Sequence, residues 1–134
     1  MRFDDKYFID FVFTKEQIKK NLENALKDLN IAHQDAIADV KFTYSYDALI
    51  KGGIALISSY GKKVKSAPGH HVKIIEMTAK ILNDDSVEAI GNAMRSKRNT
   101  DFYDGGAEVT EKESREYLDY VTDILRKIEK LLNR

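Results

Sequence analysis

The sequence predicts an all-α fold, a bundle of about five helices, on three observations. The 134 residues contain a single proline, Pro68, so almost nothing interrupts a helix. Helix-favouring Lys, Glu, Leu, Ile and Ala are used heavily throughout the chain. No Asn-Gly or Asp-Gly hairpin signal lies between alternating runs except the late Asp104-Gly105 pair. A chain of this length is expected to form one domain.

The first two helices are predicted from a cap and from apolar periodicity. Thr14 followed by Gln17 is a capping box, and a helical stripe then continues to about residue 39. A second stripe predicts a helix from about Thr43 to Tyr60, with Tyr46 on its packed face. Gly61 follows at once, where a left-handed residue would end that helix.

Two adjacent glycines, Gly52 and Gly53, lie inside the second predicted helix. Glycine is unfavourable in a helix interior, so a pair of them needs a reason. We favour the close approach of another helix. A ligand lying against the backbone would require the same absence of side chains.

The third and fourth helices are predicted on either side of a short break. A basic loop over residues 62–69 precedes a helix from about His70 to Leu82. Its inward positions are predicted to be Ile74, Ile75, Thr78 and Ile81. Asp85 and Glu88 then form a second capping box, which predicts a fourth helix carrying Val87, Ile90 and Met94 inward.

The fifth predicted helix has the cleanest amphipathic pattern in the chain. Thr110 and Glu113 form its capping box. Its apolar stripe consists of Tyr117, Val121, Ile124, Leu125, Ile128, Leu131 and Leu132.

Residues 1–13 match neither the helical nor the strand period. They are rich in aromatic and aliphatic side chains, and such a patch left exposed would be an association site. We predict an aromatic arm or short helix over 1–13, packed on the bundle or across a dimer partner, and a single helical domain over 14–134.

Charge and cysteine content limit the classes of partner and compartment. Lys plus Arg and Asp plus Glu both number 22, so any site for a polyanion must be local. The chain contains no cysteine, which excludes thiol nucleophiles and cysteine-ligated zinc. No apolar run reaches membrane-spanning length and the first residues lack a signal-peptide core, so we expect a cytoplasmic protein.

Clustered cations near the end of the fourth predicted helix form the first candidate site. Arg95 and Arg98 are three residues apart on nearly one helix face, so two guanidinium groups can converge on one phosphate. Asn99 and Tyr103 follow directly. Spacing alone also fits a solvated helix end, whose cations are favoured by the helix dipole and pair with nearby aspartates.

A histidine pair forms the second candidate site. His70 and His71 open the third predicted helix, where unpaired N–H groups favour anions and neutral imidazoles. They are candidates for proton transfer. A turn whose imidazoles satisfy local hydrogen bonds is the alternative interpretation.

Lys51, beside the glycine pair, is a third candidate for phosphate binding, although most helix-surface lysines are simply solvated. No Walker loop, dinucleotide glycine pattern or serine nucleophile elbow is present in the sequence. No histidine or carboxylate falls at a ligand spacing from the histidine pair. We therefore expect neither a metal nor a cofactor.

These segments together resemble the HEPN superfamily over about residues 14–132. The resemblance is carried by the run 46–56, by Gly69-His70-His71, by 95–99, and by Tyr103 and Asp104. It implies an up-and-down antiparallel helical bundle that is commonly dimeric and often accompanies a minimal nucleotidyltransferase. Several HEPN proteins are metal-independent ribonucleases of toxin–antitoxin or antiviral defence systems.

The HEPN nuclease motif is an arginine, a polar residue, a short spacer and a histidine. By resemblance, Arg98 matches the arginine, Asn99 the polar residue, and Tyr103 stands in the place of the histidine. In RNA cleavage, arginine would stabilise the charged phosphorane and histidine would move protons. Tyrosine has an ordinary pKa of about 10, which handicaps it as a general base near neutral pH.

Three hypotheses follow for the function. The first is a HEPN homodimer that binds RNA or nucleotide phosphates at Arg95, Arg98, Asn99 and Tyr103 and cleaves RNA without metal. The second is a non-catalytic HEPN module that accompanies a nucleotidyltransferase. The third is a structural helical interaction domain, in which the arginine segment only ties a loop to the bundle.

Overall fold

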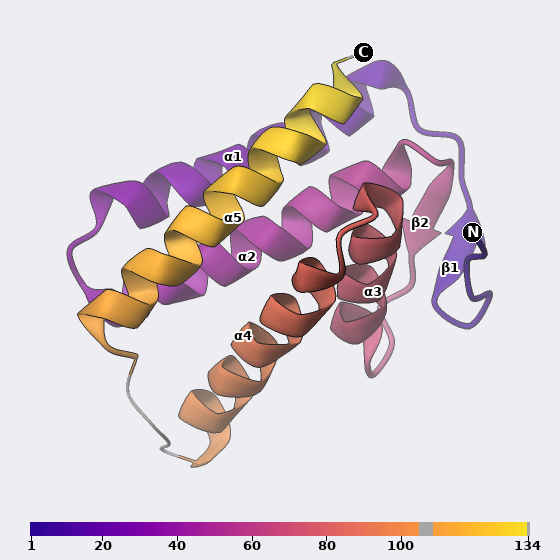
Figure 1. Cartoon of the computed structure of the whole chain (residues 1–134). Coiled ribbons are helices and arrows are strands. Elements are labelled where there is room, and N and C mark those ends of the chain that lie inside the picture. Colours follow the sequence, from indigo (N-terminus) through magenta and orange to yellow (C-terminus); the bar gives the residue numbers. More distant parts are fainter. Residues whose placement is uncertain (105–108, 134) are drawn as a thin grey trace.

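The computed structural model describes the backbone of residues 1–104 and 109–133, and the side chains of residues 1–100 and 109–133. These residues form a mostly helical structure, as predicted, with one small sheet (Figure 1). The elements in chain order are β1 (Phe8–Asp10), α1 (Lys15–Gln34), α2 (Ala38–Ser58), β2 (Lys62–Val64), α3 (His70–Leu82), α4 (Asp85–Asp104) and α5 (Glu111–Leu132).

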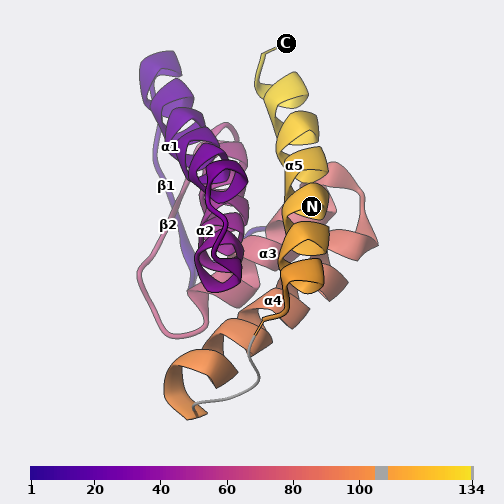
Figure 2. The same cartoon turned by 90° about the vertical axis from the view of Figure 1, so that its left-hand side faces the viewer.

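Helix α2 occupies the centre of the fold and contacts each of the other helices. α1 and α2 form a helical hairpin, and α5 lies along both of them (Figure 1). α3 packs on α2 and on α4, while α4 is tilted away from the long axis of α5 (Figure 2). The buried side chains of the core come from all of these helices. Of the helices that the structure describes, none is both long enough and apolar enough to cross a membrane.

The capping boxes of α1 and α5 are confirmed. Thr14 Oγ1 accepts a hydrogen bond from the Gln17 N–H at 3.1 Å, and Gln17 Oε1 accepts one from the Thr14 N–H at 2.8 Å. Thr110 and Glu113 form the same pair of bonds at the start of α5. Each box satisfies N–H groups that would otherwise lack partners at the helix start.

The predicted boundary between the first two helices is wrong by several residues. α1 ends at Gln34 and α2 already begins at Ala38. The Asp35 carboxylate accepts a hydrogen bond from the Ile37 N–H at 2.8 Å, which offers the backbone a turn in place of the helical ladder. The break therefore depends on a local side-chain bond that apolar periodicity does not report.

The third helix has the predicted bounds, and the cap of the fourth differs by one residue. α3 ends at Leu82, and its C-cap residue, Asn83, adopts a left-handed conformation with φ 52°. Asp85 is already the first residue of α4, so it is not the cap. The Asp84 carboxylate accepts a hydrogen bond from the Ser86 N–H at 3.0 Å instead.

The glycine pair is explained by close helix packing, as we favoured. Gly52 faces Leu125 and Ile128 of α5, whereas Gly53 faces Ile74 and Thr78 of α3. Because these two adjacent residues have no side chains, both α5 and α3 can pack closely against α2.

We predicted an aromatic arm or a short helix over the first thirteen residues, and the structure shows a short strand there in place of a helix. β1 pairs with β2 in antiparallel register, with Phe8 opposite Val64, and Phe8 is buried in the core. β2 lies within the segment that we predicted to be a basic loop. Each strand has only three residues, too few to show an alternating pattern, and they pair across a long sequence separation.

Candidate functional site

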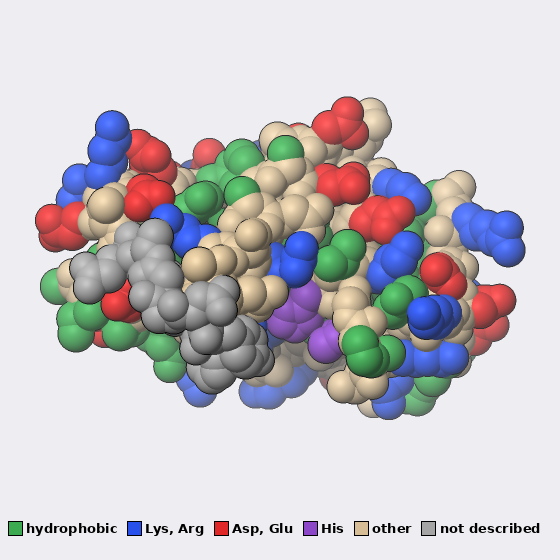
Figure 3. Space-filling model, turned by 90° about the horizontal axis from the view of Figure 1, so that it is seen from below, with side chains coloured by type: hydrophobic (Ala, Val, Ile, Leu, Met, Phe, Trp, Pro, Cys, Tyr) green, Lys and Arg blue, Asp and Glu red, His purple; other side chains and the backbone are tan. Residues whose placement is uncertain are grey.

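An open hollow of about 520 Å³ lies where the start of α3 faces α4. It is lined by residues 66–72 on one side and by Arg95, Arg98 and Asn99 on the other. The two candidate sites that the sequence predicted separately therefore meet in one place. Figure 3 shows the molecule from a side on which histidine side chains reach the surface beside a cationic one.

The packing of α4 on α3 brings the arginines to this hollow. A Cβ atom on Gly91 would lie 2.8 Å from Ile75 Cγ2, so the helices approach closely at Gly91. Arg95 and Arg98 follow four and seven residues later, on the same face of α4. That face is therefore directed towards α3.

The opposite wall is formed by the turn that opens α3. Gly69 adopts a left-handed conformation, with φ 83°, at the N-cap position, which glycine accepts without strain. The His70 N–H donates to the Ala67 carbonyl oxygen at 3.0 Å. The next N–H groups of the first turn have no partner within the helix, so this end of α3 favours an anion.

The two histidines make different side-chain hydrogen bonds. His70 Nδ1 lies 2.7 Å from the Ala67 carbonyl oxygen, and His71 Nδ1 lies 2.9 Å from the Tyr46 hydroxyl. The two imidazole rings have centroids 4.6 Å apart. Tyr46 is fully buried on α2, so its hydroxyl anchors the His71 ring from beneath the hollow.

Burial keeps both partners of this hydrogen bond uncharged, and the nearby arginines add to this effect only at His71. Burial, His70 and the two arginines lower the pKa of His71 from 6.5 to about 4. Burial raises the pKa of Tyr46 to about 12, although Arg98 and Arg95 act in the opposite direction. At neutral pH the pair is a neutral imidazole and a neutral phenol.

The arginines face the hollow without a neutralising ion pair among the described side chains. The Arg98 guanidinium carbon lies 5.5 Å from the centroid of the Tyr46 ring, a cation–π distance. Arg95 Nε makes one long bond of 3.5 Å to Asn92. Arg98 also acts on the Asp47 carboxyl: burial raises the pKa of Asp47, and Arg98 partly offsets that rise.

The structure does not bring every predicted residue to the hollow. The predicted Lys51 forms an ion pair with Asp28 of α1 at 2.6 Å. Lys97, which was not a predicted site residue but lies between the two arginines, forms one with Glu113 of α5 at 3.0 Å. Neither lysine lines the hollow. The prediction for the Tyr103 side chain lies outside the residues whose side chains are described.

Sequence reasoning missed the part that Tyr46 plays in the site. We assigned it only to the packed face of its helix. A buried tyrosine usually finds a hydrogen-bond partner for its hydroxyl. A tyrosine on an otherwise apolar helix face therefore indicated that a polar partner would lie nearby. The partner, His71, is 25 residues away in sequence.

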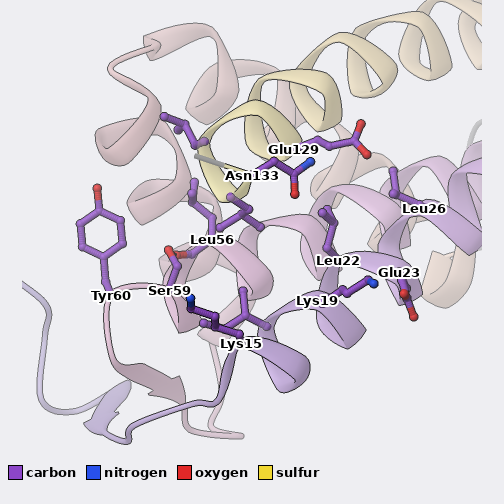
Figure 4. Close-up of a pocket in the computed structure, with 13 residues that line it drawn as sticks. Lys15, Lys19, Leu22, Glu23, Leu26, Leu56, Ser59, Tyr60, Glu129 and Asn133 are labelled. Atoms are coloured by element: carbon purple, nitrogen blue, oxygen red, sulfur yellow. The ribbon is translucent and has the colours of Figure 1, made fainter.

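A second hollow, of about 820 Å³, lies between α1, the end of α2 and the end of α5 (Figure 4). Its walls combine aliphatic side chains, such as Leu22, Leu26 and Leu56, with polar and charged ones, such as Lys15 and Glu129. It contains none of the predicted site residues. In the part of the chain that the structure describes, no cluster of His, Asp and Glu is suited to a metal ion.

The lowered pKa of His71 in the folded protein predicts that stability depends on pH. The unfolded imidazole binds a proton below pH 6.5, whereas the folded one resists protonation until about pH 4. The unfolded state therefore binds more protons in this window, and the free energy of unfolding falls as pH falls through it. We expect a loss of about 1–2 kcal/mol, after allowance for solvent screening of a partly exposed ring.

The matched control for this measurement is His71→Gln, which does not titrate and can still bond to Tyr46. Urea unfolding at pH 7 and near pH 4 should show the wild type losing more stability than the variant. Every other titratable group is present in both proteins, so the comparison isolates the substitution at residue 71. Equal losses in the two proteins would contradict the assignment to His71.

No protein-family model, curated protein or solved structure matches this chain.

Proposed function

We propose that this chain is a HEPN-type domain that binds the phosphate groups of RNA or nucleotides in the hollow between α3 and α4. The observation that carries the proposal is the pair Arg95 and Arg98, without ion pairs among the described side chains, facing the start of α3. Two guanidinium groups and a helix N-terminus together favour an anion. Because the chain has no net charge, such attraction would be local to this hollow.

Metal-independent RNA cleavage is the activity that we propose for this site. Tyr103 replaces the histidine of the nuclease motif, and the histidine pair of α3 lines the same hollow as Arg98 and Asn99. An imidazole there can take the proton of the attacking 2′-hydroxyl while the arginines stabilise charge on the phosphorus oxygens. The bond from phosphorus to the 5′-oxygen then breaks, and that oxygen leaves with a proton. A non-catalytic partner of a nucleotidyltransferase is the second candidate, favoured by the tyrosine in the motif.

The test uses a fluorescently labelled oligoribonucleotide incubated with the protein in EDTA. We expect saturable binding in anisotropy measurements, with an affinity that falls as salt rises. Cleavage products on a denaturing gel would support the nuclease. Binding without cleavage would favour the partner module, and the absence of binding would overturn the proposal.

We also propose that the domain is an antiparallel bundle that works as a cytoplasmic homodimer. Exposed apolar side chains support an interface near the small sheet: Val12 is 92% exposed, and Ile9 and Phe11 are about 40% exposed. Such side chains next to one another mark association surfaces. We expect a dimer in gel filtration with light scattering, and a monomer at micromolar concentration would contradict it.

A further inference from the structure

His70 offers a hydrogen-bond acceptor whose position is fixed by its own loop. A carbonyl oxygen can only accept, so the His70 Nδ1 that contacts Ala67 must carry the hydrogen. In the neutral imidazole the lone pair then lies on Nε2, at the other side of the ring. No described residue bonds to His70 Nε2, and His70 lines the hollow.

His71 is arranged to act as a donor beside that acceptor. Its Nδ1 is held by the Tyr46 hydroxyl, and the hydroxyl can donate or accept. A phosphate oxygen in the hollow accepts hydrogen bonds, so it selects the tautomer in which His71 carries its hydrogen on Nε2. In that tautomer Tyr46 donates to Nδ1. Tyr46 is thus a positioning residue that acts through His71.

The hollow therefore combines several hydrogen-bond donors with one hydrogen-bond acceptor of fixed direction, His70 Nε2. The arginines and His71 supply donors, as an anion requires. Asn99 also carries an acceptor, but the described residues make no bond that fixes its carboxamide. A ligand that satisfies all these groups carries a hydroxyl next to a phosphate. In nucleic acids the ribose 2′-hydroxyl is such a group, and it distinguishes RNA from DNA.

We infer that His70 is the residue that selects ribose over deoxyribose, by accepting a hydrogen bond from the 2′-hydroxyl while the arginines and His71 hold the adjacent phosphate. This inference rests on the proposed phosphate site. The inference goes beyond that site because it assigns sugar specificity to one nitrogen atom on α3, outside the arginine motif.

The experiment compares three labelled oligouridylates of equal length, with ribose, deoxyribose and 2′-fluororibose. The fluoro sugar retains a ribose-like pucker and has no hydroxyl to donate. We expect the ribose oligomer to bind about three- to tenfold more tightly than the other two, which is the value of one hydrogen bond. The matched variant is His70→Asn, whose amide can still donate to Ala67 but has no atom at the Nε2 position.

In His70→Asn the ribose preference should disappear while binding of the deoxy oligomer is unchanged. A preference that survives in this variant, or that Asn99→Ala removes instead, overturns the inference. Equal binding of ribose and 2′-fluororibose oligomers also overturns it. Those outcomes leave the phosphate site intact, whereas the failure of all three oligomers to bind wild-type protein overturns both proposals. Circular dichroism and melting temperature establish that each variant is folded.

Discussion

Gly53→Ala is expected to lower the free energy of unfolding by about 2 kcal/mol, while Gly52→Ala changes it little. The two glycines are adjacent on α2, so both substitutions gain about 1 kcal/mol of helix propensity. They differ in what the new methyl group meets. This pair of variants therefore separates packing from propensity within a single helical turn.

At Gly53 the added Cβ atom would lie 2.5 Å from Thr78 Oγ1 and 2.8 Å from Ile74 Cγ2. Both neighbours are β-branched and stiff at χ1, and Thr78 Oγ1 is further held by its bond to the Ile74 carbonyl oxygen at 2.7 Å. The clash of the added Cβ atom is relieved only if α3 moves away from α2. Overpacking of this kind costs up to about 3 kcal/mol, which exceeds the gain in propensity.

At Gly52 the added Cβ atom would lie 3.1–3.3 Å from the terminal methyl groups of Leu125 and Ile128. These atoms end flexible side chains, and a small rotation makes room for them. The remaining cost is close to the gain in propensity, so the net change is expected to be within about 0.5 kcal/mol.

Urea unfolding of the two variants is the measurement. Thr78→Ala in the Gly53→Ala background should recover part of the lost stability, because it removes the nearest atom. If Gly53→Ala is as stable as Gly52→Ala, α3 does not approach α2 as closely as the structure shows.

The helices were predictable from sequence because their signals are local. The Thr14 and Thr110 boxes and the apolar stripe of α5 each lie within one helix, and the structure confirms them. The boundary at Asp35 depends on a side-chain bond in a turn, which periodicity does not show. The sheet was missed because two strands of three residues carry no period of their own.

Each residue of the site could be predicted from the sequence, but their proximity in space could not. Arg98 and His70 belong to different helices, and only the packing of α4 on α3 brings them to one hollow. Gly91 allows that packing and shares a helix face with Arg95, so a glycine in register with two arginines was a usable signal. Lys51 was predicted to bind phosphate, but it forms an ion pair with Asp28. Nothing in its sequence context indicated that ion pair.

Arg98→Ala is expected to weaken binding of an oligoribonucleotide about ten- to a hundredfold. A hydrogen bond to a charged group contributes about 1.5–3 kcal/mol, and each 1.4 kcal/mol is a factor of ten in affinity. Arg98 has no ion pair to break among the described side chains before it binds an anion. Arg98→Lys should give an intermediate loss, because it keeps the charge and loses the planar fork.

The matched control for Arg98→Ala is Arg126→Ala, because both substitutions remove one positive charge. Arg126 is exposed on α5, bonds to Asp123 at 3.4 Å and does not line the hollow, so its loss should change affinity by less than about twofold. Arg98→Ala also removes the cation over the Tyr46 ring, worth about 0.5–1 kcal/mol of stability, so the melting temperature should fall slightly. If the melting temperature falls while affinity matches that of Arg126→Ala, Arg98 only ties α4 to α2. A large loss of affinity in a folded Arg98→Ala protein, absent from Arg126→Ala, requires that the guanidinium itself contacts the phosphate.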